Sequence, residues 1–115
     1  MKKARRLPDR GSVTRIARMF RLLGDPTRLS LLLHCLEAPR AVSDLAEAVG
    51  LSLPLTSHHL RLLRTAGLVE SDRDGRRVLY RPADEHVRHM LVDITDHVAD
   101  CLVPTQNPPT RRRKP

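Results

Sequence analysis

Only two residues, Gly50 and Leu51, connect two predicted helices in the middle of the chain, and so short a connection leaves the helices few ways to pack. Ser43 can cap the first helix, because a serine hydroxyl accepts a hydrogen bond from a free amide of the first turn. Ser52 can cap the second helix in the same way, and this helix runs to about Ala66. The pattern predicts a tight helix-turn-helix.

A β-hairpin is predicted directly after this unit. Two short β-prone runs, 68–71 and 76–81, flank the tetrapeptide Asp-Arg-Asp-Gly at 72–75. Asp-Gly between two such runs is typical of a tight turn, since glycine accepts the positive φ that hairpin turns need. We therefore expect a two-stranded wing after the helix-turn-helix.

The remaining segments predict helices on both sides. Apolar residues recur at helical spacing over 12–23, and Asp25-Pro26 begins a second helix that Pro39 closes. The predicted inner face of this second helix consists of Leu29, Leu32, Leu33 and Leu36. A last helix spans about 84–102. Its apolar stripe consists of Val87, Met90, Leu91, Ile94, Val98 and Leu102. The order α-α-α-α-β-β-α predicts a mainly α fold with a small β-hairpin, a winged helix-turn-helix.

The chain of 115 residues has room for one folded domain, which we assign to 12–103. We expect a disordered basic arm at 1–11 and a disordered Pro/Arg-rich tail at 104–115. The net charge of +8 favours a polyanionic partner. Eight cationic side chains lie near the two ends, namely Lys2, Lys3, Arg5, Arg6, Arg111, Arg112, Arg113 and Lys114. In the alternative interpretation, the excess charge belongs to these ends and the folded surface is only mildly basic.

The composition also excludes several classes of protein. Two cysteines do not make a disulfide framework, and the N-terminus lacks the apolar run of a signal peptide. The longest apolar stretch, around 29–36, is too short to span a bilayer. We therefore expect a protein of the reducing cytoplasm. With 2 % aromatic residues, the chain lacks the stacking platforms of single-strand binders.

The second helix of the helix-turn-helix carries side chains suited to duplex DNA. Thr56, Leu60 and Leu63 are spaced for the core, and polar and basic side chains fall on the opposite side. Three further arginines lie at or beside the wing tip. The candidate DNA-contacting residues are Ser52, Pro54, Thr56, Ser57, His58, Arg61, Arg64, Arg73, Arg76 and Arg77. Each group alone is consistent with an ordinary solvated surface, but a basic wing after a helix-turn-helix favours binding in the major groove.

Four segments together resemble the ArsR/SmtB family of bacterial winged-helix repressors: 22–29 (LLGDPTRL), 42–46 (VSDLA), 56–63 (TSHHLRLL) and 66–69 (AGLV). The resemblance covers about residues 13–102. It implies a homodimer through the first and last helices, an operator with dyad symmetry contacted by the fourth helix, and an inducer that releases the DNA. Leu53-Pro54 departs from the family, whose members often carry polar residues at this helix start.

The last helix carries candidate metal ligands. His86 and His97 are eleven residues apart, close to three turns, so they share one side of the helix but lie about 16 Å apart along it. An antiparallel mate helix would bring Asp84 and His86 of one subunit to His97 and Asp100 of the other, giving two equivalent sites. Two imidazoles and two carboxylates suit tetrahedral Zn(II), and this ligand pattern resembles that of the family's zinc-sensing branch. Ni(II) and Co(II) also accept nitrogen and oxygen ligands.

Several alternatives stay open. Cys35 and Cys101 are candidates for a thiol or persulfide redox sensor, and a ligand-independent DNA-binding protein is a further candidate. The segment 42–45 holds no Cys-x-Cys, which disfavours soft ions such as As(III). The polar residues of the last helix would otherwise form a solvated face, as we expect for His89, Asp93 and Asp96. No metal-hydrolase, nucleophile-elbow or phosphate-loop motif supports an enzyme.

Overall fold

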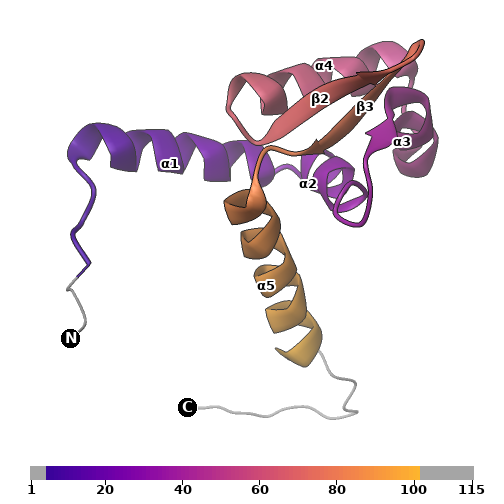
Figure 1. Cartoon of the computed structure of the whole chain (residues 1–115). Coiled ribbons are helices and arrows are strands. Elements are labelled where there is room, and N and C mark those ends of the chain that lie inside the picture. Colours follow the sequence, from indigo (N-terminus) through magenta and orange to yellow (C-terminus); the bar gives the residue numbers. More distant parts are fainter. Residues whose placement is uncertain (1–4, 102–115) are drawn as a thin grey trace.

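The computed structural model describes residues 5–101, and its element order confirms the predicted winged helix-turn-helix, with one strand added (Figure 1). The elements are α1 (Arg10–Leu23), α2 (Pro26–Leu33), β1 (Arg40–Ala41), α3 (Val42–Val49), α4 (Leu53–Thr65), β2 (Val69–Asp74), β3 (Arg77–Pro82) and α5 (Glu85–Cys101). The predicted tail, Leu102 and most of the cationic residues near the two ends lie outside the described residues.

The added strand changes the start of the helix-turn-helix. β1 pairs antiparallel with β3, so the sheet has the order β1-β3-β2. Two residues are too few to show the alternation that predicts a strand, and β1 was therefore not expected. Because β1 leads straight into α3, that helix begins at Val42, and its N-cap is Ala41, which makes no side-chain capping bond. The predicted Ser43 cap is wrong, since Ser43 lies inside the helix.

The predicted starts of α2 and α4 and the predicted end of α3 are confirmed. The predicted end of the second helix at Pro39 is wrong: α2 ends at Leu33, and the Cys35 and Leu36 amides donate to carbonyls three residues back, in a turn that leads towards β1. The Asp25 carboxylate accepts a hydrogen bond from the Arg28 amide at 3.0 Å, and Ser52 Oγ accepts one from the Leu55 amide at 3.2 Å. Gly50 ends α3 with a φ of 72°, a conformation that glycine adopts at little cost. α1 begins at Arg10, two residues earlier than predicted, so the last residues of the expected basic arm are helical.

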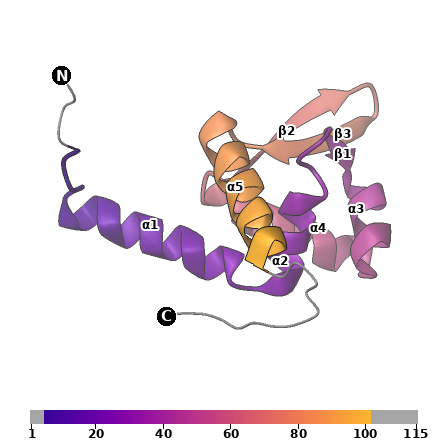
Figure 2. The ribbon, with the colours of Figure 1, turned by 90° about the horizontal axis from the view of Figure 1, so that it is seen from below.

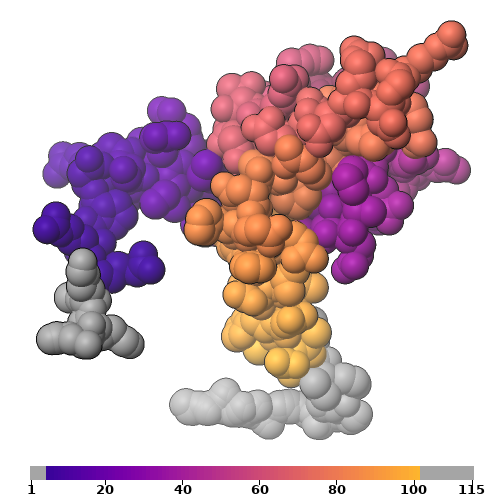
Figure 3. All heavy atoms as spheres, in the orientation of Figure 1, coloured from indigo at the N-terminus to yellow at the C-terminus, as the bar shows by residue number. Residues whose placement is uncertain are grey.

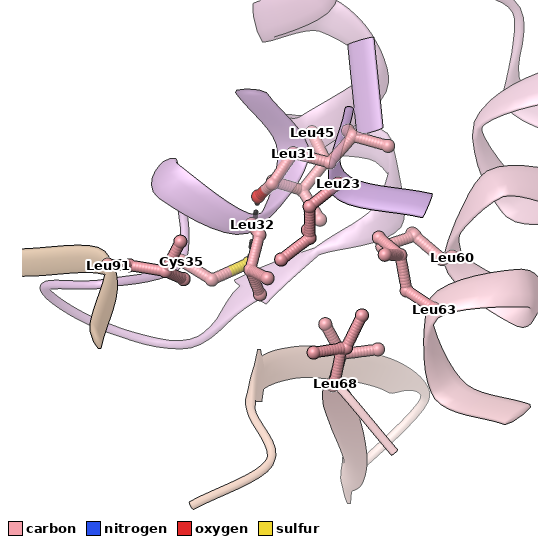
Figure 4. Packing of buried hydrophobic residues seen from close by; sticks show 10 residues of the cluster. Leu23, Leu31, Leu32, Cys35, Leu45, Leu60, Leu63, Leu68 and Leu91 are labelled. Atoms are coloured by element: carbon pink, nitrogen blue, oxygen red, sulfur yellow. Dashed lines mark hydrogen bonds between the residues drawn. The ribbon is translucent and has the colours of Figure 1, made fainter. Parts of the chain in front are cut away.

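The core is aliphatic, and α2 lies at its centre (Figure 4). The most buried members are Leu23, Leu31, Leu32, Cys35, Leu45, Leu60, Leu63, Leu68, Val69 and Leu91. The predicted inner face of the second helix consists of four leucines. Leu32 is buried, and Leu29, Leu33 and Leu36 are half-buried, Leu36 lying after the end of α2. Leu91 alone is buried among the described residues of α5. Most of α1 and α5 therefore extends away from the body (Figures 1 and 2).

Arg28 connects three helices around this core. Its Nε donates to the carbonyl of Leu22 in α1 at 2.9 Å, and its Nη1 lies 3.4 Å from Nδ1 of His59 in α4. The side chain is partly buried, so water replaces these partners poorly. This contact with Arg28 in α2 gives His59 a structural role.

Arg28→Ala is expected to lower the free energy of unfolding by about 1.5–3 kcal/mol, because it leaves the Leu22 carbonyl without its charged donor. Urea denaturation monitored by circular dichroism measures the change. Arg18→Ala, at an exposed position on α1, is the matched control and should shift stability by no more than about 0.5 kcal/mol. Equal stability of the two variants would refute the role given to Arg28.

Candidate DNA interface and metal-ligating residues

The outer face of α4 presents most of the predicted DNA-contacting side chains to solvent. Pro54, His58, Arg61 and Arg64 are exposed, and Ser57 is half-buried. Their spacing of three and four residues places them on one side of the helix, where donors for base edges and phosphates can act together.

Thr56 does not belong to this face. Its side chain is fully buried beside Leu60 and Leu63, and its hydroxyl oxygen has no hydrogen-bond partner among the described residues. The sequence spacing indicated a core position as well as a candidate DNA contact, and burial decides between them. Thr56 is removed from the DNA-contacting set. Ser52 remains in it, although its oxygen caps α4, since the hydroxyl hydrogen can still be donated.

The wing is longer than predicted. Asp74 pairs with Arg77, so Gly75 and Arg76 form the turn, and the predicted turn at 72–75 is two residues too early. Gly75 has a φ of 66°, as a tight hairpin turn requires. The hairpin tip projects from the body at the upper right of Figure 3, which exposes Arg73 and Arg76.

Arg77 has a partner within the protein. Its Nη2 lies 3.0 Å from Oδ2 of Asp44 in α3, and both side chains are more than half exposed. An exposed pair of this kind contributes little to stability, but it links the start of β3, next to the turn of the wing, to α3. Contact between Arg77 and a phosphate would have to replace or share this carboxylate.

The candidate metal ligands all lie at exposed positions in or directly before α5. His86 and His97 are eleven residues apart on one helix, about 16 Å at 1.5 Å per residue. Asp84 precedes the helix, and its Oδ1 accepts a hydrogen bond from the Val87 amide at 3.0 Å. Among residues 5–101, no group of three or more potential ligands within one protomer could hold an ion. Asp84 and His86 are therefore available at one end of α5, and His97 and Asp100 at the other.

Two further contacts on α5 distinguish its histidines. His89 Nε2 lies 3.4 Å from Oε1 of Glu85, in agreement with its assignment to the solvated face. Cys101 Sγ lies 3.7 Å from Nε2 of His97, a contact that the sequence analysis missed. The four-residue spacing of these two residues on a helix is the signal that could have found it.

The two thiols have different environments. Cys35 is buried, its Sγ donates to the Leu31 carbonyl at 3.4 Å, and burial raises the pKa of the thiol to about 11. Cys101 is exposed. Cys35 packs in the same cluster as Leu91, and Cys101 lies ten residues further along α5, about 15 Å away. One protomer therefore does not bring the two sulfurs together.

Stability is expected to fall between pH 9 and 11 through Cys35. Because the pKa is raised in the fold, from 9.0 to about 11, the stability from the protonated thiol is complete below pH 9 and is lost as the pH rises. The loss should reach about 2–3 kcal/mol relative to Cys35→Ala, whose own curve supplies the control. Urea denaturation at several pH values measures the difference. Parallel curves for the two proteins would contradict this assignment.

Apolar side chains are exposed along both projecting helices. They are Val13, Ile16 and Phe20 on α1 and Ile94 and Val98 on α5. Between the two helices the surface is hollowed (Figure 3) into a groove of about 570 Å³. Apolar side chains such as Phe20, Leu29 and Ile94 line it. An exposed apolar surface of this extent is typical of an interaction site. None of the described helices is long and apolar enough to cross a membrane.

Comparison with known proteins identifies similar chains. Residues 25–71 match the model of the family described as bacterial regulatory protein, arsR family. The HTH-type transcriptional repressor SmtB of Mycobacterium tuberculosis is 37 % identical over 96 residues, which cover 84 % of this chain and 71 % of that protein. A cadmium resistance transcriptional regulatory protein, a CadC homolog of Staphylococcus aureus, is 35 % identical over 77 residues, 66 % of this chain and 64 % of that protein. Among solved structures, a homodimeric winged helix-turn-helix DNA-binding domain from Mycobacterium bovis has a TM-score of 0.76 and 30 % identity, covering 90 % of this chain and 97 % of that one.

Proposed function

The chain belongs to the ArsR family of bacterial regulatory proteins, and from this premise we propose that it is a metal-responsive transcriptional repressor. It binds operator DNA as a homodimer and leaves the operator when Zn(II) is bound at two sites between the subunits. Ni(II) and Co(II) are the other candidate ions. Its relatives are transcriptional regulators and not enzymes. We place the protein in the cytoplasm, where bacterial DNA lies.

The observation that carries the metal response is the division of four exposed ligands between the two ends of α5. Asp84 and His86 lie too far from His97 and Asp100 to share an ion within one chain. An antiparallel α5 from a second protomer would join each pair to its complement. The name of the Staphylococcus aureus relative, which refers to cadmium resistance, supports a metal as the effector class.

The exposed apolar side chains of α1 and α5 support the dimer. They face solvent in the protomer, and a second copy would remove them from water. The homodimeric relative from Mycobacterium bovis, which covers 90 % of this chain, supports the same assembly. A twofold axis at this surface would present two copies of α4 to successive turns of the major groove, about 34 Å apart.

The donor set fits Zn(II), since two imidazoles and two carboxylates complete a tetrahedral shell. Bound there, the ion would supply positive charge that holds the two α5 helices in one arrangement. His86 and His97 would each bind it through one ring nitrogen and donate the other N–H to an acceptor that fixes the ring. The arrangement favoured in this way would separate the two α4 helices from the spacing that the operator needs.

Metal titration of the purified, chelator-treated protein tests this function. Operator affinity and metal stoichiometry are measured together for Zn(II), Ni(II) and Co(II). We expect two ions per dimer and a fall in operator affinity of about 5- to 150-fold. An affinity that no metal changes would favour the ligand-independent DNA-binding protein. An affinity that responds only to an oxidant would favour the thiol sensor.

A further inference from the structure

The first turn of α4 exposes two leucines that the dimer does not explain. Leu53 is 50 % exposed and Leu55 is 43 % exposed. α4 begins on the side of α3, away from α1, as Figures 1 and 2 both show. The other large hydrophobic residues exposed in the described chain lie on α1 and α5, apart from Leu7 before α1. Leu53 and Leu55 therefore lie outside the proposed dimer surface.

This turn also offers few backbone donors. Pro54 has no amide hydrogen, and the Leu55 amide already donates to Ser52 Oγ at 3.2 Å. A helix start normally presents several free N–H groups to a phosphate or a base edge. Here the surface of the turn is mostly hydrocarbon, and the polar side chains Ser57, His58 and Arg61 follow only in the next turns.

The start of the second helix is the part of a helix-turn-helix that contacts base edges. The C5-methyl group of thymine is the apolar group that bases present in the major groove. We infer that Leu53 and Leu55 contact thymine methyl groups in each operator half-site, an inference that rests on the proposed operator binding. The two leucines lie about 160° apart around the helix axis, on either side of Pro54, so thymines at two different steps of a half-site are expected.

The test removes single methyl groups from the DNA. An operator is first selected from random duplexes with the full-length protein, and each thymine is then replaced in turn by deoxyuridine, which lacks only the methyl group. We expect affinity to fall about fourfold for each methyl group that a leucine contacts, and about fifteenfold when the symmetry-related pair is replaced.

Variants connect this effect to the two leucines. Leu53→Ser and Leu55→Ser should each bind the thymine operator more weakly and lose the response to deoxyuridine at one step. Leu53→Met and Leu55→Met keep an apolar side chain and should keep the response. Leu7→Ser, an exposed leucine outside α4, should leave the deoxyuridine response as in the wild type.

Three results would overturn the inference while leaving operator binding intact. One is a selected operator at which no deoxyuridine replacement weakens the wild type. The second is a pair of serine variants that keep the full methyl response. The third is a pair of serine variants that keep operator affinity and change only the oligomeric state, because this would assign the leucines to a protein contact. Failure of the selection to yield any bound duplex would instead count against the proposed function.

Discussion

Phe20→Asp is expected to convert the dimer into a monomer and to weaken operator binding by roughly 10²- to 10⁴-fold. Phe20 is 58 % exposed in the protomer and lines the groove between α1 and α5, so aspartate there remains hydrated and the protomer folds normally. In the proposed dimer the same carboxylate would be buried against apolar side chains without a partner. A monomer contacts one half-site, and it loses the gain in affinity that two linked half-sites provide.

Light scattering measures the mass of the variant, and fluorescence anisotropy measures its affinity for the operator. Thr14→Asp is the matched control, because it adds the same side chain to α1 at an exposed position more than a quarter turn away from Phe20. We expect this control to remain a dimer with wild-type affinity. A dimeric Phe20→Asp protein that still binds the operator tightly would place the interface elsewhere.

The parts of the fold that depend on local chemistry were predictable from the sequence. Asp25 and Ser52 cap the helices that follow them, and Gly50 ends α3, because the residues that make each of these features lie within one helical turn. The turn of the wing is different. Every residue of 72–75 tolerates a turn, and the choice of Gly75-Arg76 depends on how far β2 and β3 pair, which the local sequence does not encode.

The candidate site shows the same division. The spacing of His86 and His97 predicted two ligands on one side of a helix, and α5 has the required length. In the proposed dimer their partners belong to a second chain, so neither the sequence nor the described residues of one protomer would contain the complete site. Thr56 shows a different limit, since helical spacing assigned it to the core, yet its place in the first turns of the DNA-contacting helix also made it a candidate for DNA contact. Burial is the property that separates these two roles.

His97→Ala is expected to abolish the release of operator DNA by Zn(II), while leaving the affinity of the metal-free protein unchanged. The wild type should lose about 5- to 150-fold in affinity when zinc is added, and the variant should lose none. His97 is exposed and contributes nothing to the core, so the fold should tolerate alanine. Anisotropy titrations with and without zinc measure both affinities. His89→Ala, which removes an exposed imidazole from the same helix, should keep the full response.

Mixed dimers separate a site between subunits from a site within one chain. His86→Ala and His97→Ala homodimers each lack one imidazole at both proposed sites, and neither should respond to zinc. In a dimer with one subunit of each kind, both substitutions fall in one site, and the other site keeps His86 from one subunit and His97 from its partner. Such a dimer should bind one ion and recover part of the response. If each variant chain stays unresponsive in the mixture, the ligands do not meet across the twofold axis, and the antiparallel pairing of α5 is wrong.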